Sequence, residues 1–422
     1  MKKYIWNKDK ILWEILSFME DKIWKRKINS CNSFFDVFAW TNNVWYFFKK
    51  EKNFQIIAND INKLSYVIWK SYIELNEYPD FSKLLKNVVD IEKVSEQDIK
   101  EYIQLNNNWR KEKYEEAIKN KNKFILFQIS TYLSLKELPK KYDWYFPFIH
   151  RNYCENGKNS NHVNRYWEKQ SRMFFSDLHW ERIDDILNLI IKWKKEELFN
   201  SDYEYYLLLA WIIEAATLFS NTSWVYESYY KKLFPNTKQQ FRIPFLKEAI
   251  NNSKENKIYN WDIMDIIENN DIEADIIYLD PPYNSREYTS NYHLLNLIAD
   301  YHNIDNPKKY EKWLILWRWQ HKDTVFKSVF CRKATFIEAM KKVVDSVKWK
   351  YVFISHYNWQ DNLWKSENNI EWFNEIKKML SDENIFKKWS FDFKYIDRKN
   401  FQSRSWLKKE IVKEIIFFAE KK

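Results

Sequence analysis

The chain contains 23 tryptophans and a single glycine among its 422 residues. An average protein of this length carries roughly 30 glycines, at about 7% usage. Glycine adopts positive φ without a steric penalty, so tight turns and loops that closely approach a ligand depend on it. We therefore interpret many tryptophan letters as positions where the functioning protein has glycine. A UGA codon written as tryptophan but read as glycine would produce this pattern.

The rest of the composition is that of a globular chain. Hydrophobic residues make up 45% and charged residues 30%, which argues against disorder. The length allows two or three domains. No apolar run approaches the roughly 18 residues of a membrane span, and residues 1–5 lack the apolar core of a signal peptide. We expect a cytoplasmic protein without a membrane anchor.

Cysteine spacing and net charge narrow the function classes further. Cys31, Cys154 and Cys331 lie far apart without a CxxC pair, which predicts neither a disulfide framework nor a zinc site. The seven histidines also lack ligand spacing, so we expect packing and polar contacts from them and no metal. The net charge of +10 favours a polyanionic partner such as nucleic acid, although lysine-rich proteomes give the same balance.

Residues 1–75 and 256–422 both show the pattern of a parallel sheet. In the first stretch, periodicity predicts helices at 11–28, 44–50 and 61–75 and buried strands at 33–39 and 54–58. In the second, it predicts strands at 257–260, 275–279, 350–355 and 411–419 and a helix at 336–347. Strand, turn, helix and strand within about 30 residues form a βαβ unit. We therefore predict an α/β fold with a mostly parallel, doubly wound sheet.

Residues 76–255 differ in character and are predicted to form a mainly helical inserted domain. Strand signals are few, and the middle of the stretch is basic. Some of its cationic side chains are expected to contact phosphates, although any one of them is more commonly a solvated surface charge. These candidates are Lys140, Lys141, Arg151, Arg165, Lys169 and Arg172.

The sharpest chemical signal is Asp280-Pro281-Pro282-Tyr283, which directly follows an apolar strand. Two prolines fix φ and restrict the residue before them, so the loop is rigid and lies where open α/β sheets bind ligands. A carboxylate, a carbonyl and an aromatic face suit a planar base that bears an exocyclic amine. Asp280 and the Pro281 carbonyl would accept the two amine N–H bonds while Tyr283 stacks on the ring. A proline-stiffened turn is the structural alternative.

Two further signals indicate a nucleotide-type cofactor. Asp36-Val-Phe-Ala-Trp40 lies between a strand and a helix, and with glycine at position 40 its backbone could pack against a ligand at the helix N-terminus. Tryptophan there blocks that approach. Asp60 follows the next strand about 20 residues later, where an acid typically accepts hydrogen bonds from ribose hydroxyls. An ordinary turn and an Asx cap are the alternatives.

Taken together, these residues resemble the D12 class of adenine-specific DNA methyltransferases, the family of the DNA adenine methylases. Residues 4–8 are similar to its N-terminal cofactor motif, and Asn260-Trp261-Asp262 to the motif whose acid faces the cofactor's adenine. Residues 288–295 resemble the helix that follows the catalytic motif. The resemblance implies cofactor-binding roles for Tyr4, Trp6, Lys8, Asp36, Phe38, Ala39, Trp40, Asp60, Asp262 and Asp280, and catalytic roles for Asp280, Pro281, Pro282 and Tyr283. Asn284, Arg286 and Tyr288 follow the catalytic loop and are expected either to contact DNA or to brace the loop.

The departures from the family pattern support the glycine hypothesis. Trp6, Trp40 and Trp261 stand where the family carries glycine, and Trp224 and Trp349 where a turn residue is expected. Random drift would not place one bulky residue at so many glycine positions.

The resemblance implies a class I, Rossmann-like methyltransferase fold in which S-adenosylmethionine donates a methyl group to adenine N6. Residues 1–75 and 256–422 would form the catalytic domain, and 76–255 the domain that recognises the target in double-stranded DNA. The base would be flipped out of the duplex without a metal or a covalent enzyme intermediate. A restriction-modification role with a cognate endonuclease is a further implication.

Two alternatives stay open. An RNA base methyltransferase uses the same tetrapeptide, although such enzymes usually lack a large insert at this point. If the tryptophans are real, a catalytically inactive DNA-binding protein is the other alternative.

Overall fold

The structure is a computed structural model. It describes residues 11–23, 30–40, 44–106, 115, 119–140, 142, 144–163, 167–222, 225–244, 249–269, 272–282, 288–314, 320–357, 368–399 and 411–422. The chain divides into two compact units. The sheet unit comprises Tyr4–Tyr66, Ile250–Glu287 and Lys327–Lys422, and the helical unit comprises Met1–Lys3, Val67–Ala249 and Tyr288–Phe326.

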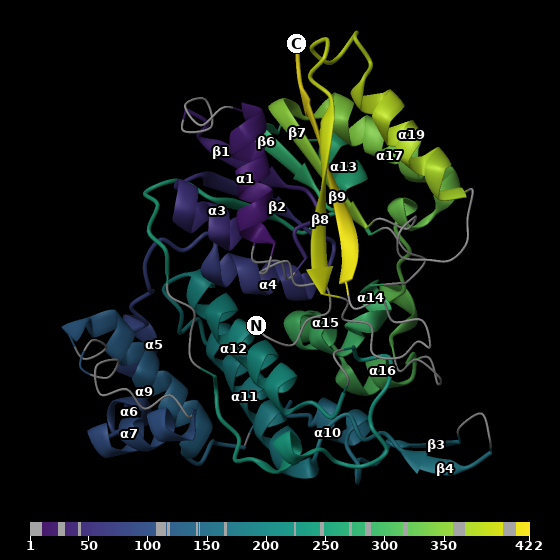
Figure 1. Ribbon diagram of the computed structural model, residues 1–422. Coiled ribbons are helices and arrows are strands. Elements are labelled where there is room, and N and C mark those ends of the chain that lie inside the picture. The colour runs from purple at the N-terminus through teal and green to yellow at the C-terminus, as the bar shows by residue number, and fades with distance from the viewer. Residues whose placement is uncertain are drawn as a thin grey trace. The chain divides into compact units, whose positions relative to one another are not determined.

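The sheet unit is built on a seven-stranded sheet of order β5-β2-β1-β6-β7-β9-β8 (Figure 1). Its strands are β1 (Ser33–Asp36), β2 (Gln55–Asn59), β5 (Lys257–Tyr259), β6 (Glu273–Leu279), β7 (Lys348–Tyr357), β8 (Asp392–Lys399) and β9 (Ile411–Glu420). The pairs from β5 to β7 are parallel, whereas β9 runs antiparallel to both of its neighbours. Two stretches of chain far apart in sequence therefore build one sheet, as predicted.

Helices cover both faces of this sheet. On one face, Phe34 of β1 stacks on Phe48 of α3 (Val44–Lys52) at 4.5 Å between ring centroids, and Phe353 of β7 meets Phe18 of α1 (Leu12–Ile23) at 6.2 Å. On the other face, a core that includes Phe35 collects side chains from the helices α13 (Ile263–Asn269), α17 (Lys333–Ser346) and α19 (Asn368–Leu380). From Ala274 to Leu279, β6 is buried on both faces, which is the pattern of a central parallel strand. The predicted doubly wound α/β fold is confirmed.

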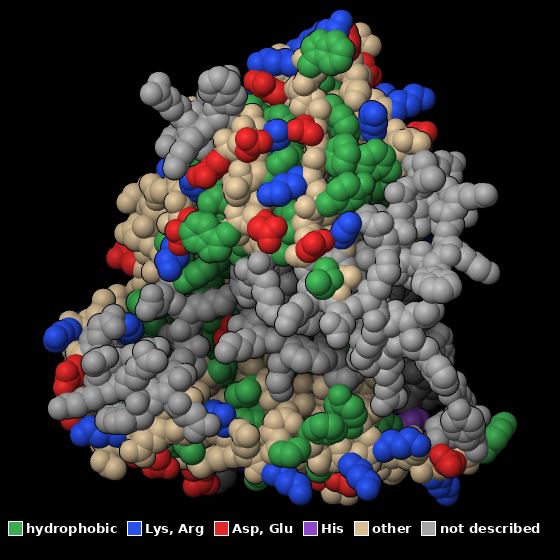
Figure 2. Space-filling view, viewed as in Figure 1, with side chains coloured by type: hydrophobic (Ala, Val, Ile, Leu, Met, Phe, Trp, Pro, Cys, Tyr) green, Lys and Arg blue, Asp and Glu red, His purple; other side chains and the backbone are tan. Residues whose placement is uncertain are grey.

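The edge strand β8 was not expected from the sequence. Its residues, Asp-Phe-Lys-Tyr-Ile-Asp-Arg-Lys, alternate charged and apolar side chains. In Figure 2, side chains of both charge signs lie over β8 and β9, and Lys22 of α1 pairs with Asp392 at 2.6 Å. Charged side chains on an edge strand discourage pairing with the edge of another sheet.

The helical unit contains most of the predicted insert and, in addition, the segment that follows the catalytic motif. Its principal elements are α5 (Ser82–Asn87), α6 (Val89–Glu92), α7 (Glu96–Leu105), α9 (Lys121–Leu135), α10 (Phe148–Tyr153), α11 (Asp177–Lys195), α12 (Asp202–Phe219), α14 (Tyr288–Asn291), α15 (His293–Asp300) and α16 (Pro307–Glu311). The short strands β3 (Asn161–Val163) and β4 (Lys169–Ser171) pair antiparallel. Helix α4 (Lys63–Tyr72) crosses from the sheet unit into the helical unit. None of the described helices is long and apolar enough to cross a membrane.

The single glycine occupies a position that tolerates no side chain. A Cβ atom at Gly157 would lie 2.2 Å from the carbonyl oxygen of His150 and 2.7 Å from that of Arg151. The backbone of this loop therefore packs directly against the backbone of α10, an approach that only glycine permits.

Three tryptophans have backbone conformations that are typical of glycine. Among the described residues, φ is positive at Trp40 (35°), Trp167 (63°) and Trp389 (65°). The side chains of Trp167 and Trp389 are 89% and 90% exposed, so no packing holds them in this conformation. A bulky residue at positive φ is a genuine outlier, and the left-handed conformation costs an L-residue roughly 1–2 kcal/mol.

Replacing Trp167 or Trp389 with glycine is expected to raise the free energy of unfolding by about 1 kcal/mol each. Relief of the left-handed strain outweighs the extra entropy of glycine in the unfolded chain. Trp13, which is 62% exposed in α1, is the matched control, since Trp13→Gly should lower the free energy of unfolding by a similar amount. Urea unfolding of the three variants measures these changes. Equal destabilisation by all three substitutions would contradict the interpretation that the backbone at positions 167 and 389 favours glycine.

One expectation about the tryptophans is wrong. Trp349 lies in β7 and not in a turn. Its side chain is 5% exposed, and its indole nitrogen donates to the carbonyl oxygen of Val344 at 2.7 Å. The position follows α17 by only three residues, so the strand begins where a turn was expected.

Candidate functional site

The site lies where the direction of the sheet's winding reverses. β1 pairs with β2 on one side and with β6 on the other, and both pairs are parallel. The chain moves outward from β1 to β2 and, separately, from β6 to β7. Ligands of open α/β sheets bind at such a switch point, beyond the carboxyl ends of the strands. The segments of interest are therefore those that follow β1 and β6.

The segment after β1 is the predicted cofactor loop. Asp36, the last residue of β1, is 1% exposed, and Ala39 is fully buried. The amide of Val37 donates to the Tyr278 carbonyl of β6 at 3.0 Å, and the amide of Ala39 donates to the Asn59 carbonyl of β2 at 3.0 Å. The loop is thus fastened to both neighbouring strands before it reaches position 40.

The side chains of Phe38 and Trp40, which both extend from this loop, have different surroundings. The ring of Phe38 packs edge-on against Phe330, with 4.7 Å between centroids, so its side chain belongs to the core. Trp40 is 8% exposed, and its indole occupies buried volume at the point where the backbone would have to approach a nucleotide-type ligand.

Asp60 directly follows β2 and binds the loop after β1 through a hydrogen bond. Its Oδ2 accepts the amide of Trp40 at 3.0 Å, while its Oδ1 accepts the amide and side chain of Asn62 at 2.7 and 2.8 Å. The bonds from Asn62 form an Asx turn before α4 and do not cap a helical amide of α4, and the bond to Trp40 is additional. Burial raises the pKa of Asp60 to about 6, although its hydrogen bonds to Asn62 and Trp40 lower it.

Asp262 lies beyond β5 and directly precedes α13. Its Oδ1 accepts the amide of Met264 at 3.0 Å, and its carbonyl oxygen accepts the amides of Asp265 and Ile266 at 3.1 Å. Burial raises the pKa of Asp262, although the bond from Met264 lowers it. The carboxylate therefore has a capping role in this structure, and its role toward a cofactor stays a prediction.

The predicted catalytic motif begins at the end of β6. Tyr278 of β6 pairs in register with Asp36 of β1, and Leu279 ends the strand, so Asp280 follows β6 just beyond the edge where β1 also ends. Pro281 is buried, whereas Asp280 and Pro282 are partly exposed. The motif thus directly follows a buried strand, as its interpretation requires.

Several predicted site residues lie outside the described residues. These are Tyr4, Trp6 and Lys8 of the N-terminal motif and Tyr283, Asn284 and Arg286 after the prolines. Tyr288 begins α14. The described part of the candidate site therefore consists of the loops after β1, β2, β5 and β6.

Comparison with known proteins decides the family. The profile of the D12 class of N6 adenine-specific DNA methyltransferases matches residues 4–176 and 165–310. The chain belongs to this family. No solved structure matches this chain significantly.

Three similar curated proteins come from bacteria. The type II methyltransferase M.FokI of Planomicrobium okeanokoites is 29% identical over 84% of this chain and 44% of its own length. The modification methylase StsI of Streptococcus sanguinis is 26% identical over 100% of this chain and 52% of its own. The type II methyltransferase M.NlaIII of Neisseria lactamica is 32% identical over 44% of this chain and 52% of its own. This chain thus spans about half the length of these relatives.

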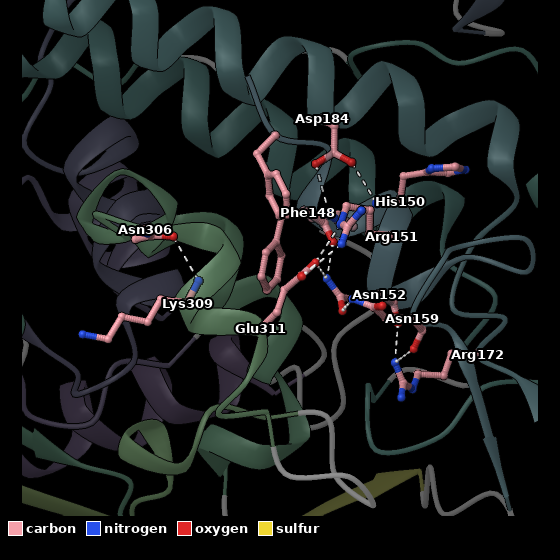
Figure 3. Close-up of polar contacts among 12 residues, drawn as sticks. Phe148, His150, Arg151, Asn152, Asn159, Arg172, Asp184, Asn306, Lys309 and Glu311 are labelled. Carbon is pink, nitrogen blue, oxygen red and sulfur yellow. Dashed lines mark hydrogen bonds and ion pairs between the residues drawn. The ribbon is translucent and has the colours of Figure 1, made fainter. Parts of the chain in front are cut away.

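Two of the basic side chains predicted to contact phosphates are instead bound within the helical unit (Figure 3). The Arg151 Nε donates to Glu311 Oε1 at 2.8 Å and its Nη2 to Oε2 at 3.2 Å. The Arg172 Nη1 donates to the carbonyl oxygens of Asn152 and Asn159, both at 2.8 Å. Arg172 is 3% exposed, and burial lowers its pKa to about 9.

The other basic candidates differ in environment. Lys140 pairs with Asp185 at 3.2 Å, whereas Lys169 is exposed on β4. Lys141 and Arg165 lie outside the described residues. Of the six candidates, Lys169 is therefore a described side chain that stays open to a phosphate.

A buried carboxylate stabilises α10 in the same part of the helical unit. Asp184 of α11 accepts the amides of Ile149 and His150 at 3.1 and 2.8 Å and so satisfies the first turn of α10 (Figure 3). Burial raises the pKa of Asp184 to about 8, although these two hydrogen bonds lower it.

The histidines near the sheet and the catalytic segment contact aromatic side chains. The ring of His293 lies 6.1 Å from that of Phe174, and its Nδ1 lies 2.9 Å from the Ser290 carbonyl oxygen. Burial lowers its pKa to about 4. His356 packs against Trp372 with 3.5 Å between centroids. Among the described residues, no group of three or more His, Cys, Asp and Glu side chains could hold a metal ion.

Sequence reasoning missed two asparagines that join the loops of the site. Asn59 ends β2, and Asn260 follows β5. The Asn260 Nδ2 donates to the Asp60 carbonyl oxygen at 2.8 Å. Asn260 stands in the motif Asn260-Trp261-Asp262 and Asn59 directly precedes Asp60, and this nearness to a predicted acidic residue was the signal available in the sequence.

Proposed function

We propose that this chain transfers a methyl group from S-adenosylmethionine to N6 of adenine in duplex DNA. The observation that carries the proposal is the position of Asp280-Pro281-Pro282 directly after β6, beside the fastened loop of β1 at the switch point. Membership of the D12 class supports the same reaction. The names of the relatives M.FokI and StsI describe a type II methyltransferase and a modification methylase.

The residues of the catalytic loop would activate the amine by hydrogen bonding. The lone pair of adenine N6 is delocalised into the ring, so the amine is a poor nucleophile. Asp280 and the Pro281 carbonyl would accept its two N–H bonds, localise the lone pair and fix its direction. Tyr283 would stack on the base, and stacking on an aromatic ring contributes about 1–3 kcal/mol. This offsets part of the few kcal/mol that flipping the base out of the duplex costs.

The cofactor loops fit S-adenosylmethionine at every described position except one. Asp60 would accept hydrogen bonds from the ribose hydroxyls, and Asp262 would face the adenine. When bound, the cofactor supplies an electrophilic methyl group on a sulfonium. The indole of Trp40 does not fit, because it is buried where the loop backbone must approach the ligand. The proposed function therefore requires glycine at position 40.

The helical unit would supply target recognition. It contains the insert together with residues 288–326, and Tyr288 joins Asn284 and Arg286 as a candidate DNA contact after the catalytic loop. Lys169 on the β3–β4 ribbon is an additional candidate for a phosphate contact. A modification role beside a cognate restriction endonuclease fits the relatives' names.

A methyl-transfer assay with two nucleic acids tests the proposal. The full chain carrying Trp6→Gly, Trp40→Gly and Trp261→Gly, here called the triple-glycine chain, is incubated with radiolabelled S-adenosylmethionine and either duplex DNA or RNA. We expect label in DNA that co-migrates with N6-methyl-2′-deoxyadenosine after digestion to nucleosides. Label in RNA alone would support the RNA methyltransferase. Binding of DNA without any transfer would support an inactive DNA-binding protein.

The affinity for S-adenosylmethionine is expected to fall as the pH drops through about 6. Burial raises the pKa of Asp60 to about 6, and only the ionised carboxylate accepts hydrogen bonds from both ribose hydroxyls. Below that pH the dissociation constant should rise by up to about tenfold per pH unit. Titration calorimetry from pH 8 to pH 5 on the triple-glycine chain measures it.

The contribution of Asp60 to the free energy of unfolding should change with pH in the direction opposite to the affinity for S-adenosylmethionine. The pKa of Asp60 is raised above its unfolded value of 3.8, so its contribution to the free energy of unfolding is present below about pH 4 and is lost as the pH rises through about 6.

Asp60→Asn is the control variant for the titration. Its affinity for S-adenosylmethionine should be weak and should not change as the pH passes through about 6. A step of the same size in this variant would assign the titration to another group.

A further inference from the structure

Asn59 joins two loops of the site through its side chain and its own backbone carbonyl group. Its Nδ2 donates to the Val37 carbonyl oxygen in the loop after β1 at 3.4 Å, and its Oδ1 accepts the Trp261 amide in the loop after β5 at 3.4 Å. Its backbone carbonyl accepts the Ala39 amide at 3.0 Å. The residue is 2% exposed, so water does not compete strongly for these bonds.

The two loops that Asn59 joins both reach Asp60. The Trp40 amide, just after Ala39, donates to the Asp60 carboxylate, and the Asn260 side chain, just before Trp261, donates to the Asp60 carbonyl oxygen. Movement of either loop would therefore change the surroundings of the candidate ribose acid. An asparagine suits this position because one short side chain offers a donor and an acceptor together. An ionised aspartate would lack the donor, and alanine would lack both.

We propose that Asn59 is a positioning residue of the cofactor pocket, which holds the loops after β1 and β5 at the spacing that S-adenosylmethionine requires. The inference rests on the proposed function and deepens it, because it adds a residue with no direct contact to the reacting atoms. A displacement of about 1 Å in a positioned group can cost on the order of 100-fold in rate or binding.

The same strands provide a matched control at their opposite end. Asn256 precedes β5 and is 5% exposed. Its Oδ1 accepts the Ile56 amide at 2.9 Å, and its Nδ2 donates to Asn252 Oδ1 and to the Lys254 carbonyl oxygen at 3.1 and 3.2 Å. It is a buried, bridging asparagine between β2 and β5 that belongs to none of the site loops.

The test compares Asn59→Ala, Asn59→Asp and Asn256→Ala in the triple-glycine chain. We expect both Asn59 variants to raise the KM for S-adenosylmethionine by about 10- to 100-fold, with the KM for DNA unchanged. Asn256→Ala should lower the melting temperature like Asn59→Ala but leave both KM values unchanged. Unchanged KM for the cofactor in the Asn59 variants, or an equal increase in Asn256→Ala, would overturn the proposal. Absence of transfer by the triple-glycine parent would count against the proposed function instead.

A second inference rests on backbone conformation and composition. We infer that the functional protein carries glycine at positions 40, 167 and 389. At each of these positions tryptophan has positive φ, in a chain with 23 tryptophans and one glycine. Each lies in a turn or loop: position 40 in the loop after β1, position 167 in the connection from β3 to β4, and position 389 in the turn before β8. Such places require the backbone freedom of glycine.

Peptide mass spectrometry of the protein from its natural source tests this inference. Peptides that span the three positions should each show the mass of glycine. A tryptophan mass at any one position would overturn the inference for that position, and tryptophan masses at all three would overturn it altogether.

Discussion

The Trp40→Gly variant of the full chain is expected to bind S-adenosylmethionine at least about 100-fold more tightly than the chain with tryptophan, on the order of 3 kcal/mol. The indole of Trp40 is 8% exposed and the backbone there has a φ of 35°. Glycine removes the buried ring from the place where the backbone must meet the ligand and relieves the left-handed strain. Titration calorimetry of the two full chains measures the difference.

Trp389→Gly is the matched control for this measurement. It makes the same substitution at a positive-φ position, in the turn before β8. It should raise stability without changing the affinity for S-adenosylmethionine. Equal affinities of the chain with Trp40 and its Trp40→Gly variant would contradict the assignment of this loop to the cofactor.

Asp280→Ala in the triple-glycine chain is expected to lower kcat by on the order of 1,000-fold or more. The carboxylate is assigned a hydrogen bond that strengthens as the amine lone pair localises, so its removal acts on the chemical step. DNA binding should change little. Single-turnover methyl transfer and a DNA-binding titration separate the two effects.

Two variants control for charge and for geometry. Asp265→Ala removes an exposed carboxylate from α13 and should leave kcat unchanged. Asp280→Asn retains one acceptor oxygen and should keep more activity than Asp280→Ala. Unimpaired transfer by Asp280→Ala would exclude the assigned role.

The central strands were predictable because burial on both faces leaves a plain signal. β6 carries Ala-Asp-Ile-Ile-Tyr-Leu, a run that is buried from Ala274 onward, and polar residues directly follow β2 and β6. Local sequence therefore placed the predicted loops at the carboxyl edge of the sheet. The edge strand β8 was missed because it pairs with another strand on one side only. Charged side chains therefore alternate with apolar ones along it, and it lacks the continuous apolar run of a central strand.

Contacts between distant residues could not be read from the sequence. The Arg151–Glu311 pair joins residues 160 positions apart and brings α16 into the same unit as the insert. A count of basic residues does not distinguish such a guanidinium from one that faces DNA. The role of Asn59 was hidden for a related reason, because its partners Val37 and Trp261 lie on two other strand ends.

The most direct test of the account is to express the triple-glycine chain in a methylation-deficient bacterial host and to map modified bases in the host DNA by long-read sequencing. We expect N6-methyladenine at one short recurrent sequence and no modification when Asp280→Ala is expressed at the same level. Unmodified adenines in cells that contain the folded, cofactor-binding triple-glycine chain would contradict it.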